Sequence, residues 1–265
     1  MKTYDYDRSS AIAALREAGV RRGDILFSHV GVGFLGLPQG EASALTAALI
    51  LEEAFTEVLG EEGTLIVPTY TYSFCNGEDY DPDTTPSTVG QFTEWFRTRP
   101  GVVRSLEPIF SVAARGARAH ELLHALPPDS FGDDSIYGRL LRAGGSLCNI
   151  GVGFRYATFV HFVEQLVGVP YRYKKKFNGN LIEGGKKIPL EVTYYVRSEK
   201  AGDDSLPDLS RLEEDAMRSG ALHTASLGRG VVTNIPCRDF FDLAKEGINK
   251  NPWYLTKGFE THPAL

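Results

Sequence analysis

Apolar and polar residues in the first two thirds of the chain alternate between patterns typical of helices and of short buried strands. Amphipathic spacing and stop residues predict helices over residues 8–18, 41–59, 87–98, 117–126, 135–143 and 156–168. Runs of apolar residues between them predict strands over residues 24–29, 64–69, 109–114 and 146–151. This alternation favours an α/β fold with a central, largely parallel sheet and helices on both faces.

The pattern changes after the last of these helices. Residues 171–197 are aromatic, basic and β-branched, which predicts an antiparallel hairpin or meander, and a helix–strand–strand–helix tail follows. No linker rich in Pro, Gly or Ser separates the two parts. We therefore expect residues 1–265 to form a single domain with a C-terminal antiparallel β segment.

The first predicted strand runs into the glycine-rich stretch SHVGVGFLG, residues 28–36. Gly31, Gly33 and Gly36 have the G-x-G-x-x-G spacing of dinucleotide-binding loops, but the next helix is postponed to about Glu41. The second strand also ends without the carboxylate that would bind a ribose. The stretch is therefore interpreted as a strand-end loop of another kind.

The sequence GVGF recurs at residues 151–154, again directly after a predicted strand. The helix that follows has an apolar stripe at i, i+3, i+4 and i+7, formed by Phe159, Phe162, Val163 and Leu166. Its other face carries Thr158, His161, Glu164 and Gln165. Open α/β sheets bind ligands at such strand ends, so this face is a candidate site; a solvated face with an ordinary histidine is the alternative.

A second pair of histidines lies in the H-E-x-x-H pattern of residues 120–124, a spacing used by zinc hydrolases. Pro127 and Pro128 end the predicted helix at once, and no third histidine follows at the extended spacing. A zinc hydrolase using His120 and His124 stays an alternative, but a chance match is favoured and no metal is expected.

Charge and composition narrow the class of protein. The 265 residues contain 28 Lys and Arg against 34 Asp and Glu, a net charge of −6, so no nucleic-acid partner is expected. The first ten residues are too polar for a signal peptide, and the longest uncharged apolar run, 42–51, is too short for a membrane span. The three scattered cysteines fit reduced thiols. A cytoplasmic protein is expected, and a homodimer is left open.

A turn-rich loop over residues 80–88 leads into the helix that bears Glu94 and Arg97. Arg104 and Ser105 then precede Pro108 and the third predicted strand. These segments either cap a helix or face a substrate next to a cofactor channel.

Six motifs in order resemble the aminoglycoside 3-N-acetyltransferase family. They are H-x-x-x-x-x-L-G at 29–36, G-T-L-I-V-P-T-Y at 63–70, Y-D-P-x-T-x-P-S at 80–87, E-x-F/W-R at 94–97, V-R-S at 103–105 with Pro108 and Ser111, and T-x-x-H-x-x-E at 158–164. The resemblance covers roughly residues 10 to 250.

The resemblance implies an acyl-CoA-dependent N-acyltransferase, with coenzyme A between the loop after the first strand and the segment 105–111. The implied cofactor-binding residues are His29, Val30, Gly31, Val32, Gly33, Phe34, Leu35, Ser105, Phe110 and Ser111. His161 would be the catalytic base, with Thr158 beside it and Glu164, or another carboxylate such as Glu94, orienting the imidazole. Independently of the resemblance, we expect direct acyl transfer without an acyl-enzyme, because neither Cys75 nor Cys148 has a histidine or basic neighbour in sequence to lower its pKa.

One departure from the family pattern bears on the acceptor amine. Antibiotic-modifying members commonly read R-S-x-H-P where this chain has Glu107 before Pro108, and the runs 107–111 and 169–173 look like a branch among surface-polysaccharide enzymes. Acceptor contacts are expected from Tyr72, Asp81, Glu94, Glu107 and Arg172. The favoured acceptor is a nucleotide-linked amino sugar, as in lipopolysaccharide biosynthesis; an aminoglycoside, or a catalytically inert sugar- or nucleotide-binding relative, are the alternatives.

Overall fold

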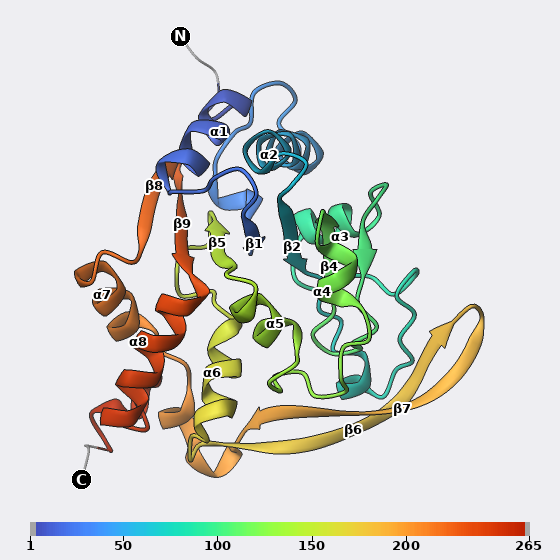
Figure 1. Ribbon diagram of the computed structural model, residues 1–265, viewed down its shortest axis with the longest axis vertical. Helices are drawn as coiled ribbons and strands as arrows, with labels where there is room; N and C mark the ends of the chain where they lie inside the picture. The colour runs from blue at the N-terminus through green and yellow to red at the C-terminus, as the bar shows by residue number, and fades with distance from the viewer. Residues whose placement is uncertain (1–3, 263–265) are drawn as a thin grey trace.

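The computed structural model describes residues 4–262. Within them, seven strands form one sheet in the order β3-β4-β2-β1-β5-β9-β8 (Figure 1). The strands are β1 (Ile25–Phe27), β2 (Thr64–Pro68), β3 (Val103–Arg104), β4 (Val112–Gly116), β5 (Ser146–Ile150), β8 (His223–Leu227) and β9 (Gly230–Pro236). The central strand β1 pairs in parallel with β2 and β5, and the flanking pairs are antiparallel.

The parallel part of the sheet is therefore confined to its centre. On one flank, β8 and β9 are joined by a tight turn at Gly228, which can only connect antiparallel neighbours. The antiparallel return of β4 beside β2 makes the other flank. The α/β class with helices on both faces agrees with the prediction.

Helices cover the two faces in chain order. One face is packed by α1 (Arg8–Glu17), α2 (Ala44–Leu59) and α3 (Gln91–Arg97). The other is packed by α4 (Ala119–Leu123), α5 (Ile136–Arg142), α6 (Phe159–Val167), α7 (Ser210–Arg218) and α8 (Cys237–Lys250). In β1, Ile25 and Phe27 enter one core while Leu26 enters the other, as the two-residue period of a strand requires.

The segment after α6 forms the predicted hairpin, β6 (Arg172–Glu183) with β7 (Lys186–Arg197), as a separate two-stranded sheet. Figure 1 shows this long ribbon running past the end of α6 and away from the central sheet. Four short 3₁₀ helices complete the described chain: η1 (Val32–Phe34), η2 (Ser73–Asn76), η3 (Glu199–Ser205) and η4 (Lys257–Phe259).

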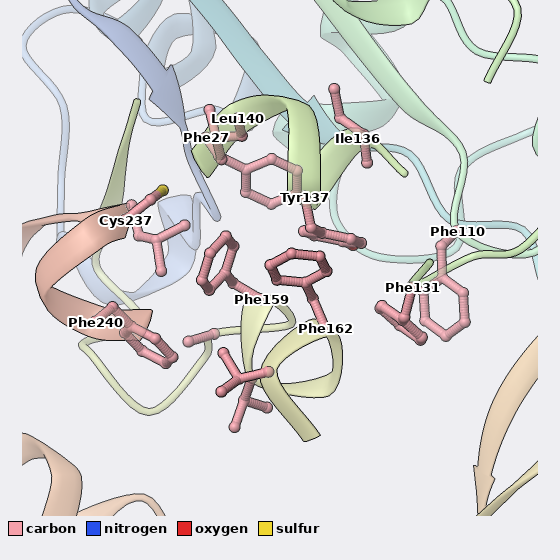
Figure 2. Packing of buried hydrophobic residues seen from close by; sticks show 14 of the residues in the cluster. Phe27, Phe110, Phe131, Ile136, Tyr137, Leu140, Phe159, Phe162, Cys237 and Phe240 are labelled. Atoms are coloured by element: carbon pink, nitrogen blue, oxygen red, sulfur yellow. The ribbon is translucent and has the colours of Figure 1, made fainter. Parts of the chain in front are cut away.

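The apolar stripe of α6 faces the core for three of its four predicted positions. Figure 2 shows Phe159 and Phe162 packed beside Tyr137 and near Phe27 and Phe240. Phe159, Phe162 and Val163 are buried, but Leu166 is 43% exposed, because α6 ends one residue later and its last turn leaves the core. The packed stripe holds the opposite, polar face of α6 in a fixed orientation.

Several predicted boundaries shift. Helix α3 begins at Gln91 rather than at 87, because Ser87 and Thr88 belong to the preceding loop, where the Thr88 hydroxyl donates to the Tyr70 carbonyl. The third predicted strand begins at Val112, after a loop over residues 108–111. The two-residue strand β3 was not predicted, since so short a strand has no readable period. Among the helices of residues 4–262, none has the length and apolar character needed to cross a membrane.

Candidate active site

The two GVGF loops lie side by side because they follow neighbouring strands. Val30 bridges to Ile150, and the Gly31 amide donates to the Ile150 carbonyl at 2.8 Å. A Cβ on Gly151 would lie 2.5 Å from the Gly31 carbonyl oxygen, and one on Gly31 would lie 2.5 Å from Val152. The repeated glycines therefore permit a close approach of two backbones at the carboxyl end of the parallel strands.

A cavity of about 340 Å³ opens beside these loops. It is lined by His29, Val30, Gly31, Val32, Gly33, Phe34, Pro68, Val89, Gly90, Gln91, Val152 and Tyr156. Phe34 and Tyr156 are more than half exposed and are the large aromatic residues of its wall. Six of the seven loop residues predicted for the cofactor thus line one cavity, whereas the seventh, Leu35, is buried in the core and does not.

The segment 105–111 does not present the side chains that were predicted to contact the cofactor. The Ser105 hydroxyl accepts from the Val112 amide at 3.0 Å, and the Ser111 hydroxyl donates to the Thr69 carbonyl at 2.6 Å; both residues are buried. Phe110 is buried against the rings of Tyr70 and Phe131. These three side chains lie in the interior and lack the exposure that ligand contact requires.

The polar face of α6 carries a histidine–carboxylate pair. His161 Nδ1 lies 2.7 Å from Glu164 Oε2, one helical turn away. The Tyr171 hydroxyl donates to Glu164 Oε1 at 2.9 Å, and Arg172 Nε lies 2.7 Å from Oε2. The His161 side chain is 18% exposed and that of Glu164 is 2% exposed, so the imidazole is the accessible member of the pair, although it is not among the residues that line the cavity.

These contacts shift the pKa values of both members of the pair. Burial would raise the pKa of Glu164, but Arg172, His161 and the Tyr171 hydroxyl together bring it below its usual value. Burial lowers the pKa of His161, and the Arg172 guanidinium lowers it further against the opposing effect of Glu164. With Nδ1–H donated to an ionised carboxylate, a neutral imidazole presents Nε2 as its free acceptor.

A second histidine, His29, connects the cavity with α6. Its Nδ1 lies 3.3 Å from Asn149 Oδ1 and its Nε2 lies 3.2 Å from the Thr158 hydroxyl, at the start of α6. Burial lowers the pKa of His29 to about 4, so the ring is neutral. The sequence reading missed Asn149, although an amide at the end of an apolar strand, just before a glycine loop, is a signal that could have identified it.

Four residues predicted to touch the acceptor have partners inside the protein. Arg172 is held on Glu164 with 4% side-chain exposure. Glu107 is buried and accepts from the amides of Ile109 and Phe110 and from the Ser130 hydroxyl, and burial raises its pKa to about 7.

The other two of these four residues, Glu94 and Asp81, accept hydrogen bonds from the loop that precedes α3. Glu94 pairs with Arg97 at 2.7 Å and accepts from the Ser87 amide, and Asp81 accepts from the Asp83 amide at 2.9 Å. The fifth predicted contact, Tyr72, has a positive φ of 55° and packs edge-on against Tyr70 and Phe110. The structure therefore does not bring these five residues together as one surface.

The H-E-x-x-H pattern does not form a zinc site. Helix α4 ends at Leu123, and His124 has extended backbone angles, so the two imidazoles do not share a helical face. Over residues 4–262 there is no group of three or more His, Cys, Asp or Glu side chains placed to hold a metal ion. Nothing in the described chain supports the zinc-hydrolase alternative.

Comparison with known proteins identifies the family. The sequence model of the aminoglycoside 3-N-acetyltransferases matches residues 39–249. The chain belongs to the aminoglycoside 3-N-acetyltransferase family. It is 30% identical to aminoglycoside N(3)-acetyltransferase IV of a Salmonella species over 254 residues, 94% of this chain and 90% of that protein. It is 28% identical to aminoglycoside N(3)-acetyltransferase III of Acinetobacter baumannii over 98% of this chain and 95% of that protein.

Solved structures share the fold at lower identity. AAC(3)-Xa superposes with a TM-score of 0.81 at 20% identity, covering 95% of this chain and 94% of that chain. AAC-IIIb, solved as a binary complex with CoASH, has a TM-score of 0.78 at 20% identity, covering 92% and 96%. The family resemblance and the expected N-acyltransferase class are thereby confirmed. The predicted nucleotide-linked amino-sugar branch gains no support, because these relatives are named for aminoglycosides.

Proposed function

We propose that this member of the aminoglycoside 3-N-acetyltransferase family transfers an acetyl group from acetyl-CoA to an amine of an aminoglycoside, with His161 as general base. The observation that carries the proposal is the His161–Glu164 pair on a helix that starts beside the strand-end cavity. Thr158, at the start of the helix that carries the pair, links this helix to the cavity, since its hydroxyl lies 3.2 Å from Nε2 of His29, which lines the cavity.

The chemistry requires a base because an amine is mostly protonated near neutral pH and attacks a thioester only as the free base. Neutral His161 accepts the amine proton at Nε2 as the nitrogen bonds to the thioester carbonyl carbon. When the carbon–sulfur bond breaks, the imidazolium returns a proton to the departing thiolate. Glu164 stabilises the imidazolium between the two proton transfers and keeps the ring oriented.

The cavity fits the donor better than the acceptor. Its walls are mostly apolar side chains and glycine backbone, suited to the slender pantetheine arm of coenzyme A, with exposed Phe34 and Tyr156 available to cover it. Gly33 lines the cavity with open space at its Cβ position. The relative AAC-IIIb, which shares the fold, was solved with CoASH.

Three observations favour a polycationic aminoglycoside as acceptor over a nucleotide-linked sugar. The relatives are named for aminoglycosides, and Arg172, a cation that could have bound a diphosphate, is buried against Glu164. A net charge of −6 also favours encounter with a polycation.

The test is release of free thiol from acetyl-CoA with a panel of aminoglycosides and of nucleotide-linked amino sugars. We expect turnover with aminoglycosides and none with the same compounds already acetylated at the 3-amine, which serve as matched controls. Turnover of nucleotide-linked amino sugars alone would reverse the acceptor assignment. No thiol release with any amine, from folded protein that binds coenzyme A, would indicate an inert relative.

A further inference from the structure

Arg172 is a buried cation that contacts Glu164, the carboxylate of the candidate catalytic pair. It is the first residue of β6, its side chain is 4% exposed, and its second contact is with the Tyr195 carbonyl at 3.3 Å. Burying a guanidinium is costly unless it is paired, and the partner of Arg172 is the carboxylate of the candidate catalytic pair.

Arg172 and His161 share one carboxylate oxygen. Arg172 Nε and His161 Nδ1 each lie 2.7 Å from Glu164 Oε2, while Oε1 accepts from the Tyr171 hydroxyl. Tyr171 and the first residue of β6, Arg172, therefore occupy both oxygens of Glu164. An imidazolium at His161 would have to share the negative charge of Glu164 with a permanent cation.

We propose that Arg172 is a positioning residue of the acyltransfer reaction, which fixes Glu164 and offsets its charge so that His161 stays in the neutral, proton-accepting form. This inference rests on the proposed function. Tyr171 completes the arrangement by holding the second oxygen, so that the carboxylate cannot rotate away from the imidazole.

The remaining ionisable groups near the pair do not substitute for this cation. Tyr194 and Tyr195 of β7 interact with Arg172 and Glu164, and burial raises the pKa of both phenols, so they stay neutral. Tyr171 is likewise neutral, since burial raises its pKa.

Two carboxylates reach toward the same region from the loops before α5. Glu107 accepts from Ser130, next to Phe131, whose ring packs edge-on against His161. Asp129 is paired with Lys174 at 3.0 Å and accepts from Gln165. Arg172 is thus the cation that contacts Glu164 within the described residues.

The direct test is titration of the His161 imidazole by NMR, with His161→Ala assigning the signal. In the wild type we expect a pKa below the usual 6.5 of histidine. The Arg172→Gln variant keeps an N–H donor but removes the charge. In it, the apparent pKa of the His161–Glu164 pair should rise by about 1 to 2 pH units. Arg172→Lys should stay near the wild type.

The matched control is Arg197→Gln. Arg197 pairs with Arg172 in the β6–β7 register but is exposed and contacts Ser205 and Gly202, so it should leave the titration unchanged. An Arg172→Gln variant that titrates like the wild type would overturn the proposal. If that variant does not fold, a wild-type His161 pKa at or above 6.5 would overturn it equally.

Activity adds a second readout. In Arg172→Gln the acidic limb of the kcat/KM profile should move to higher pH by the same amount, so activity falls about 10-fold per displaced pH unit below the limb and recovers above it. A merely structural residue would lower activity equally at every pH. Because NMR titration needs no substrate, failure of the proposed function would leave the test of Arg172 intact.

Discussion

At the scale of single residues, the site depends on which side chains are left free to reach a substrate. His161 is partly exposed, and its partner Glu164 is buried and held from three sides. His29 has both ring nitrogens engaged and a pKa lowered to about 4, so it is a poor base near neutral pH. Exposure and hydrogen bonding, rather than residue type, therefore distinguish the two histidines.

We expect His161→Ala to lower turnover by about 10²- to 10⁴-fold, the usual contribution of a positioned base, while coenzyme A affinity is retained. Steady-state rates at saturating substrates and a binding titration measure the two effects. His120→Ala, an exposed histidine on α4, is the control and should keep wild-type turnover. Near wild-type turnover of His161→Ala would remove this residue from the mechanism.

At the scale of elements, the glycines of the loop after β1 differ in what surrounds the position that a side chain would occupy. Gly36 has a φ of +83° and lies against Asp5, so it serves the turn, and Gly31 serves the close approach to Val152. Gly33 lies inside η1 without a positive φ, and nothing lies within 4 Å of its Cβ position. The three glycines of one motif therefore have three different physical roles.

Gly33→Val should fold like the wild type and weaken coenzyme A binding by about 10-fold or more, since filling a close contact typically costs 1–3 kcal/mol. The backbone is not strained by a side chain here, so any loss reports occupation of the cavity. Calorimetric titration with coenzyme A measures the affinity, and Gly33→Ala should give a smaller loss. Unchanged affinity in folded Gly33→Val would place the cofactor elsewhere.

At the scale of the whole molecule, the sheet gathers the cavity loops at the carboxyl ends of β1, β2 and β5, and α6 starts at the same edge. We expect none of the three thiols of the chain to act as a nucleophile in this reaction. Cys148 and Cys237 are buried, and burial raises the pKa of Cys75 to about 11 and that of Cys148 to about 12. A thiol that stays protonated is a weak nucleophile.

Direct transfer between two bound substrates is therefore expected, and double-reciprocal plots of initial rate should give intersecting lines. The control is a Cys75→Ser variant, which should keep the wild-type pattern and rate. Parallel lines accompanied by an acetylated cysteine in the mass spectrum would show a covalent intermediate and contradict this prediction.

The sequence by itself predicted most of the local elements, and the family resemblance of its motifs supplied His161 as the candidate base. Hydrophobic periods predicted most of the helices and strands and the apolar stripe of Phe159, Phe162 and Val163 that packs α6 on the core, because such patterns depend on neighbours in the chain. Only the tertiary structure decided that Arg172 lies on Glu164, that Glu107 is buried, and that Asn149 orients His29. These contacts join residues from different elements, and burial is settled only when the elements pack, so no spacing along the chain encodes them. The same limit explains why the sequence assigned Arg172 and Glu107 to the acceptor, whereas packing assigned both to the interior.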